Sequence, residues 1–197
     1  NTVAALTSGV VTATISEGDM STLAGLTETG NAYTVTITDA SVVSSALNTL
    51  DGKTTVAVNA AAVTTLTGLA ADANTAYASS GISGLGNEAV TLSDTSLAAT
   101  VLNTLDGNTT GAVNAATVTT LTGTAATANT AYASSGISGL GNEAVTLSDT
   151  SLATTVLNTL DGNTTGAVNA ATVTTLTGTA ATANTAYASS GISGLGN

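Results

Sequence analysis

The aspartates are the side chains of this chain best suited to chemistry. Asp94 and Asp106 are the candidates for a carboxylate pair, since cleavage of a glycosidic bond needs two acids about 5 to 10 Å apart across a cleft. Both recur one repeat later, as Asp149 and Asp161, so the same site would be present in each copy. The chain has no His or Cys, and Lys53 is its only basic residue. Most acid–base and nucleophilic sites need one of these side chains.

We therefore expect no enzymatic activity and assign no catalytic, cofactor-binding or metal-binding residue. A structural role is the simpler interpretation of the aspartates, because Asp caps helix N-termini and favours Asp-Gly turns. We expect the first role for Asp39, Asp94 and Asp149, and the second for Asp51, Asp106 and Asp161.

The turn Asp106-Gly107-Asn108-Thr109 is a second candidate, for an ion site. It offers one carboxylate, an amide and hydroxyl groups, whereas Ca²⁺ takes about six to eight oxygens, usually from several carboxylates. The glycine-rich nonapeptide of calcium-binding β-rolls is missing. We expect no cofactor and favour a solvated turn, with Ca²⁺ kept as the alternative.

Threonines and asparagines recur at fixed places in the chain. Thr-x-Thr motifs at 12–14, 34–36, 120–122 and 175–177 would form regular rows of hydroxyl groups on a flat parallel sheet. Such a surface resembles that of ice-binding solenoids, although Thr also simply suits an exposed strand.

Asn108 and Asn163 each open a glycosylation sequon. Lys53 stands at the equivalent position of the degenerate copy, where we expect a solvated turn residue. Repeated asparagines are expected to satisfy backbone groups at turns: Asn48, Asn103 and Asn158; Asn59, Asn114 and Asn169; Asn74, Asn129 and Asn184.

The composition limits the partners of the chain. Twelve acids against one base give a net charge of −11, which argues against nucleic acid and anionic lipid, since both need clustered Lys or Arg. No apolar run approaches the roughly 18 residues of a membrane span, and we identify no signal-peptide pattern in these residues. Apolar residues make up 43%, without Phe or Trp, so the core must be thin and repeated.

An internal repeat organises the sequence. Residues 88–142 return as 143–197 with a single change, Ala99 to Thr154, and 39–87 carry a degenerate copy. Residues 1–38 form a divergent first unit. A period of this size indicates a solenoid or array, and we interpret the chain as one continuous solenoid excerpted from a longer array.

Each repeat is predicted to alternate strands and helices. Strands are expected at 89–93 and 112–115, and at 117–122, where a helical turn is the alternative. Leu97, Val101, Leu102 and Leu105 form the stripe of a first helix that ends at Gly107 in a left-handed cap, and a second helix covers 125–134 with Gly136 as its capping glycine. In the divergent unit, strands at 9–15 and 33–38 flank a short helix bearing Met20, Leu23 and Leu26.

This order predicts an α/β fold: an elongated right-handed repeat solenoid, with parallel strands stacked along one side and short helices on another. Each repeat is expected to contain two coils of unequal length, a shorter one at 88–110 and a longer one at 111–142.

Three phrases of the repeat, at 102–111, 121–126 and 131–137, resemble repeats of very long cell-surface and secreted proteins of marine cyanobacteria, including giant proteins linked to swimming motility. The resemblance implies an extracellular structural or adhesive role and transfers no site residue. We expect a non-enzymatic rod, filament subunit or stalk at the cell surface. Its partners would be neighbouring repeats, further copies end to end, or a surface or matrix partner that the sequence does not identify. A calcium-dependent adhesin module and an ice-binding solenoid are the alternatives.

Overall fold

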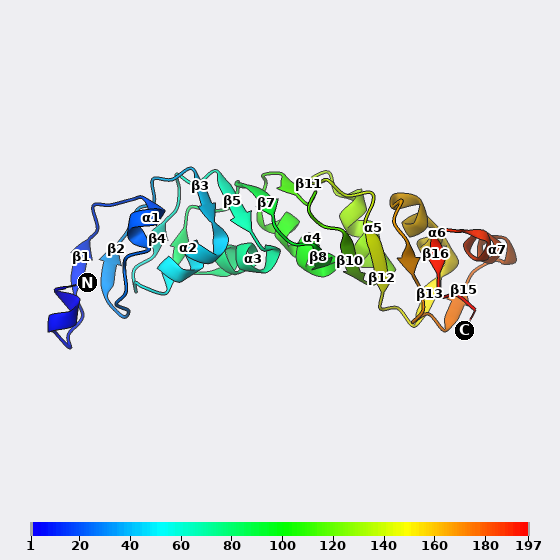
Figure 1. The fold of residues 1–197 in the computed structure, drawn as a ribbon, viewed down its shortest axis with the longest axis horizontal. Helices are drawn as coiled ribbons and strands as arrows, with labels where there is room; N and C mark the ends of the chain where they lie inside the picture. The colour runs from blue at the N-terminus through cyan, green and yellow to red at the C-terminus, as the bar shows by residue number, and fades with distance from the viewer. Residues whose placement is uncertain (1, 197) are drawn as a thin grey trace. The chain divides into compact units, whose positions relative to one another are not determined.

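The computed structural model describes residues 2–196 and confirms the α/β class with parallel strands. Within these residues sixteen strands, seven α-helices and one 3-10 helix follow one another along the chain (Figure 1). They fall into two compact units, one of residues up to 91 with 108–112, the other of 92–107 with 113 onward.

The first unit holds the divergent block and the degenerate repeat. Its elements are η1 (Ala4–Leu6), β1 (Thr12–Thr14), α1 (Met20–Leu23), β2 (Ala32–Thr34), β3 (Ser41–Val43), α2 (Ser44–Asp51), β4 (Val58–Asn59), β5 (Thr65–Gly68), α3 (Ala70–Ala78), β6 (Ile82–Ser83) and β7 (Ala89–Leu92). β1 pairs with β2, β3 with β5, and β4 with β6, and every pair is parallel.

The second unit holds most of the two near-identical repeats. Its elements are β8 (Ser96–Ala98), α4 (Ala99–Asn108), β9 (Val113–Asn114), β10 (Thr120–Gly123), α5 (Ala125–Ala133), β11 (Ile137–Ser138), β12 (Ala144–Leu147), β13 (Ser151–Ala153), α6 (Thr154–Asn163), β14 (Val168–Asn169), β15 (Thr175–Thr177), α7 (Ala180–Ala188) and β16 (Ile192–Ser193). One sheet runs in the order β16-β14-β12-β10-β8, beside the pairs β9–β11 and β13–β15.

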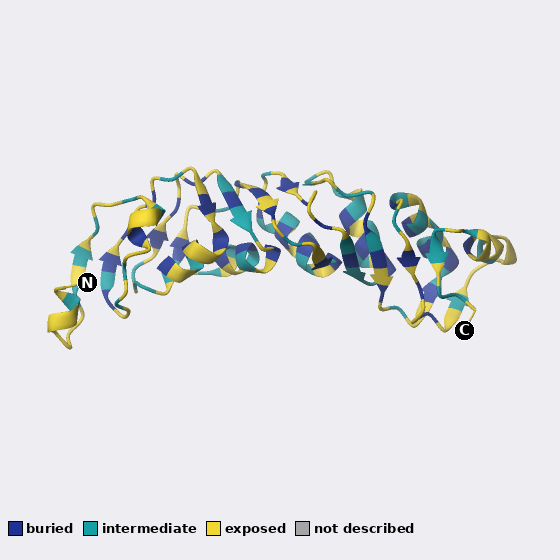
Figure 2. Ribbon diagram, in the orientation of Figure 1, coloured by how far each residue is buried: buried dark blue, intermediate teal, exposed yellow. Residues whose placement is uncertain are grey.

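The register of the parallel strands places like residues side by side. Leu121 of β10 pairs with Leu97 of β8 on one side and with Val145 of β12 on the other. All three side chains are buried, and their flanking residues are more exposed, as the alternation of strand side chains requires (Figure 2). Each buried leucine contributes about 1.5 to 3 kcal/mol to folding, so the stacked rows form the core.

Paired strands of the second unit recur at a nearly constant interval. Strands β8, β10, β12, β14 and β16 carry the successive partners Leu97, Leu121, Val145, Val168 and Ile192, which are 24, 24, 23 and 24 residues apart. The predicted division into unequal coils at 88–110 and 111–142 is therefore wrong, because the pairing sets one interval of about 24 residues throughout this row.

The helices are close to prediction but begin and end differently. Leu97 lies on β8 rather than on the helical stripe, since α4 begins at Ala99. Gly107 lies inside α4, and neither Gly107 nor Gly136 has a positive φ, so the two predicted left-handed caps are wrong. α5 ends instead at Ala133, and the residue that follows it, Ser134, is extended.

Small residues form the buried face of the second predicted helix. Ala125, Ala128 and Ala131 of α5 are buried, whereas Tyr132 is half-buried. Alanine has the highest helix propensity, its small side chain lets neighbouring helices approach closely, and α5 packs on α6. Residues 117–122 resolve into a turn followed by the strand β10.

The divergent block follows its prediction in outline. β1 and β2 overlap the predicted strands, and α1 begins after Asp19, whose carboxylate accepts hydrogen bonds from the backbone N–H groups of Ser21 and Thr22. A hydrogen bond from the Ser21 side chain lowers the pKa of Asp19 most, and these backbone bonds lower it further. No helix within 2–196 combines the length and the apolar character needed to cross a bilayer.

Candidate functional site

Two glutamates are fully buried, a rare position for an acid. Glu88 and Glu143 are 0% exposed, and each directly precedes a strand, β7 for Glu88 and β12 for Glu143. The loop before each strand contains two glycines with positive φ, which in the second unit are Gly139 and Gly141. This backbone turns sharply and leads the glutamate side chain inward.

In the second unit the Glu143 carboxylate is held by two donors. Its Oε2 accepts hydrogen bonds from the Tyr132 hydroxyl at 3.0 Å and from the backbone N–H of Gly141 at 2.8 Å. The Glu143 backbone carbonyl accepts another from the Thr164 hydroxyl at 2.6 Å. We call Tyr132, Gly141, Glu143 and Thr164 the Glu143 cluster. It joins α5, the loop before β12 and the segment after α6.

The first unit contains the same arrangement. Glu88 Oε2 accepts from the Tyr77 hydroxyl at 3.0 Å and from the N–H groups of Gly86 at 2.8 Å and Asn87 at 3.1 Å. The Thr109 hydroxyl donates to the Glu88 carbonyl at 2.7 Å. Tyr77, Gly86, Glu88 and Thr109 form the Glu88 cluster, so the contact is a property of the repeat.

A glycine after each threonine lets the segments approach. A Cβ on Gly111 would overlap the Glu88 carbonyl oxygen, and a Cβ on Gly166 would overlap that of Glu143. The N–H of Gly166 also donates to Thr164 Oγ1 at 3.0 Å. Threonine and glycine are therefore both required at this position of the repeat.

The electrostatics of the clusters are unusual, since neither carboxylate has a cationic partner in either cluster. Oε1 of Glu88 and of Glu143 accepts no hydrogen bond from any described residue. Burial raises the pKa of the Tyr77 and Tyr132 hydroxyls, the nearby glutamate raises it further, and a hydrogen bond with Thr109 or Thr164 lowers it in part. Both tyrosines therefore stay protonated and remain donors well above neutral pH.

This arrangement connects segments of the chain and offers a substrate no access. A catalytic acid must reach the proton that it transfers, and these carboxylates have no exposed surface. Burying a carboxylate costs several kcal/mol unless donors compensate, and the donors here come from consecutive segments. The clusters therefore hold the segments in one register.

Sequence reasoning treated Glu88 and Glu143 only as repeat boundaries. The missed signal is the tyrosine 11 residues upstream in each case, Tyr77 and Tyr132, together with the glycines that flank the loop. Tyr33 stands where the later copies have glutamate, and the Thr54 hydroxyl still donates to its carbonyl at 2.7 Å. The threonine contact therefore persists in the divergent block without the carboxylate.

The Asp-Gly aspartates also connect segments. Asp106 Oδ2 accepts a hydrogen bond from the Ser134 hydroxyl at 2.6 Å, 28 residues later, and a Cβ on Gly136 would overlap Oδ1. The same bond joins Asp51 to Ser79 and Asp161 to Ser189, each at 2.7 Å. These aspartates lie in the last turns of α2, α4 and α6, not in the predicted solvated turns.

Two of the predicted capping aspartates cap helices that precede them. Asp149 Oδ2 accepts from the N–H of Ala125, the first residue of α5, at 2.8 Å, and Asp39 Oδ2 does the same for Met20 of α1 at 2.7 Å. The prediction placed the Asp94 and Asp149 caps on the following helices, but a strand, β8 or β13, separates each aspartate from that helix.

Two further predictions concern an ion site at the Asp106 turn and regular rows of threonine hydroxyl groups. Within residues 2–196 no three acidic, His or Cys side chains are grouped so that they could hold a metal ion. The outward row that contains Thr122 and Thr146 continues as Ala98 on one side, and as Asn169 and Ser193 on the other. The row is chemically mixed.

The repeated asparagines do satisfy backbone groups. Asn103 Nδ2 donates to the Thr127 carbonyl at 2.9 Å, 24 residues later, and Asn114 Oδ1 accepts from the N–H of Ala116 at 3.0 Å within a turn. Asn163, which opens a sequon, donates to Asn129 Oδ1 at 2.9 Å. A glycan on Asn163 would attach to this same Nδ2 atom.

Comparison of the chain with protein-family models, with curated proteins and with solved structures found no match.

Replacing the buried glutamate tests the cluster. Glu143→Ala leaves the Tyr132 hydroxyl and the Gly141 N–H buried without an acceptor, and we expect it to lower the free energy of unfolding by about 3 to 5 kcal/mol. Glu143→Gln keeps one acceptor oxygen and should cost less. Urea unfolding of the two variants measures the difference, with Glu17→Ala, at an exposed position, as the control. If the free energy of unfolding fell by an equally small amount in both variants, Glu143 would not stabilise the fold through these hydrogen bonds.

The tyrosines predict the response to alkaline pH. Because the folded-state pKa of Tyr77 and Tyr132 is raised, unfolded tyrosine loses its proton first, near pH 10, and the free energy of unfolding falls as the pH rises further. The slope is at most about 1.4 kcal/mol per pH unit per tyrosine, and less for half-buried groups. Urea unfolding between pH 7 and 11 should show this fall, and the Tyr77→Phe/Tyr132→Phe variant should show a shallower one.

Tyr187→Phe controls for the substitution itself, because Tyr187 is 58% exposed. An unchanged slope in the double variant would mean that other groups govern the alkaline response.

Proposed function

We propose that the chain is a non-enzymatic structural segment of a longer repeat protein, built as a right-handed α/β solenoid that serves as a rod, filament subunit or stalk at the cell surface. Its partners in this proposal are neighbouring repeats or further copies stacked end to end. The likeness of its repeats to those of giant cyanobacterial surface proteins supports the extracellular location. The handedness follows the general rule for parallel crossovers.

The observation that carries the proposal is the use of the repeated polar side chains. The Asp, Asn, Glu and Thr residues that recur in the copies bind the neighbouring segments, as in Asp106–Ser134, Asn158–Thr182, Thr164–Glu143 and Asn163–Asn129. A repeated binding site would instead keep polar groups free to meet a ligand. Side chains used in this way favour a property of the whole array, such as its length.

Near-identity of the copies points in the same direction. Only one residue differs between 88–142 and 143–197, so each position must suit its equivalent in the next copy. Solenoids have this property, because every repeat contacts its neighbours alone and stability grows with the number of repeats.

Small-angle X-ray scattering of chains with one and two added copies of 143–197 tests the architecture. Each copy adds two segments, so the maximum dimension should rise in equal steps of about 10 to 20 Å, between two strand spacings and two helix spacings. A compact arrangement would show a much smaller increase.

Immunogold labelling of intact producing cells, before and after protease treatment, tests the proposed location at the cell surface. Label confined to the cell interior would overturn that location.

Removal of calcium separates the structural segment from a calcium-dependent adhesin. A segment held by hydrogen bonds and apolar rows should keep its melting temperature within about 1 °C when Ca²⁺ is replaced by a chelator. Differential scanning calorimetry in CaCl₂ and in EDTA makes the comparison. A fall of more than about 5 °C in EDTA would favour the calcium-dependent alternative.

A further inference from the structure

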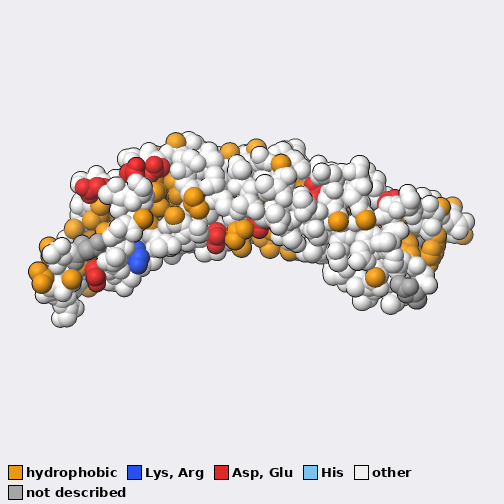
Figure 3. Space-filling view, in the orientation of Figure 1, with side chains coloured by type: hydrophobic (Ala, Val, Ile, Leu, Met, Phe, Trp, Pro, Cys, Tyr) orange, Lys and Arg blue, Asp and Glu red, His pale blue; other side chains and the backbone are white. Residues whose placement is uncertain are grey.

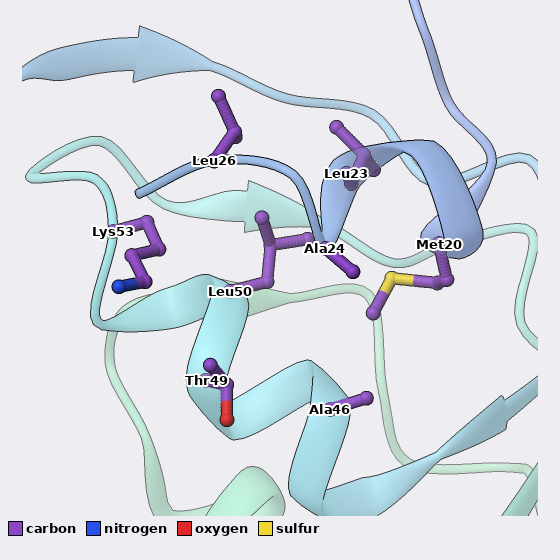
Figure 4. Close-up of a pocket in the computed structure, with 8 residues that line it drawn as sticks. All are labelled: Met20, Leu23, Ala24, Leu26, Ala46, Thr49, Leu50 and Lys53. Carbon is purple, nitrogen blue, oxygen red and sulfur yellow. The ribbon is translucent and has the colours of Figure 1, made fainter. Parts of the chain in front are cut away.

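An apolar pocket lies in the first unit, between α1 and α2. It has a volume of about 220 Å³. Leu23 and Leu26 line it from α1 and the loop that follows, and Leu50 lines it from α2 (Figure 4). Met20 and Lys53 lie on opposite sides of it. Leu23 and Leu50 are buried, whereas Leu26 is partly exposed. The pocket is therefore open to solvent and lined mainly by carbon.

The pocket exists because the helix that covers α2 is short. α1 has four residues, whereas α5, which packs on the equivalent helix α6 in the second unit, has nine. There, Asn129 of α5 donates to the Val156 carbonyl at 3.1 Å and accepts from Asn163 at 2.9 Å. This pair of hydrogen bonds ties α5 to α6, and α1 offers no asparagine to make it.

Lys53 replaces the asparagine that donates to the facing helix in the second unit, Asn163. It stands where the later copies have Asn108 and Asn163, and it is the only Lys or Arg of the chain (Figure 3). Lys53 lines one side of the pocket (Figure 4). Its amino group donates a hydrogen bond to the Thr27 carbonyl at 3.3 Å. An ammonium group has three hydrogens, so two remain for another acceptor.

We propose that this pocket binds a small organic carboxylate, with its apolar body against Leu23, Leu26 and Leu50 and its carboxylate on the Lys53 amino group. The charge selects the head of the ligand, because Lys53 is the single cation in a chain of net charge −11. The lining selects the body, because apolar groups leave water for an apolar surface. The proposal does not depend on the structural role proposed above.

The size of the pocket limits the ligand. An apolar cavity of about 150 Å³ holds one benzene molecule, so about 220 Å³ accommodates a ring or a short alkyl chain. Longer chains would extend into solvent, and a protein helix would be far too large to enter. A single apolar side chain of a partner protein would fit, but it would carry no charge for Lys53.

Titration with sodium octanoate, followed by NMR chemical shifts and by calorimetry, tests the proposal. We expect saturable binding in roughly the millimolar range, with the largest shifts at Leu23, Leu50 and Lys53. Octan-1-ol, which has the same chain without the charge, should bind about five-fold more weakly. Lys53→Asn, which restores the residue of the later copies, should remove this difference.

Two further variants locate the binding. Ala46→Leu should fill the pocket and abolish binding of both probes, and circular dichroism reports whether it folds; the shift map of the unaltered chain locates the site independently. Asn163→Lys places the cation beside α6, where α5 covers the helix, and should create no second site. The proposal fails if octanoate does not bind up to about 10 mM, if octanol binds equally well, or if the shifts lie outside the pocket.

Discussion

The apolar and polar contacts of this protein both follow from the parallel pairing of equivalent strands in consecutive segments. Backbone hydrogen bonds in such pairs fix which residue lies beside which, and a slip of one residue would turn each side chain to the other face. In the second unit this register gives the buried row Leu97, Leu121, Val145 and Val168. Small and branched side chains satisfy it, because each must pack on a similar residue in the next segment.

Buried polar side chains must also fit this register, and they do so through hydrogen bonds. A buried acid has no cation available within its cluster, so its cost must be offset by hydrogen-bond donors, and the Glu143 cluster draws these from α5 and from the glycine loop. The glutamate of the second unit lies between β11 and β12. Because its donors are correctly placed in one register alone, the carboxylate favours that register over a shifted one. Removing it should therefore affect uniqueness of pairing as well as stability.

Much of this fold could be predicted from the sequence, and the failures share one cause. Periodicity identified α5 and the strands β7, β9 and β10 because these patterns are local. The spacing of Leu97 to Val101 and Leu105 fits a helix, but pairing with Leu121 holds Leu97 on a strand. Gly136 follows a helix as a cap would, whereas its small size is needed beside Asp106 in the last turn of α4. The Glu88 and Glu143 clusters were missed for the same reason, since their partners come from segments distant in sequence.

Exact repetition and ligand binding place opposite demands on a residue. In the two near-identical copies a polar side chain such as Asn163 has a partner in the neighbouring helix, and its Nδ2 already donates there. The divergent block lacks that neighbour: α1 is a single short turn, Tyr33 replaces the glutamate, and Lys53 replaces the asparagine. Apolar surface that the later copies cover with a helix is left open there. In a protein of this design a specific site can therefore arise where the repeat is broken, and the regular copies supply the stable framework that carries it.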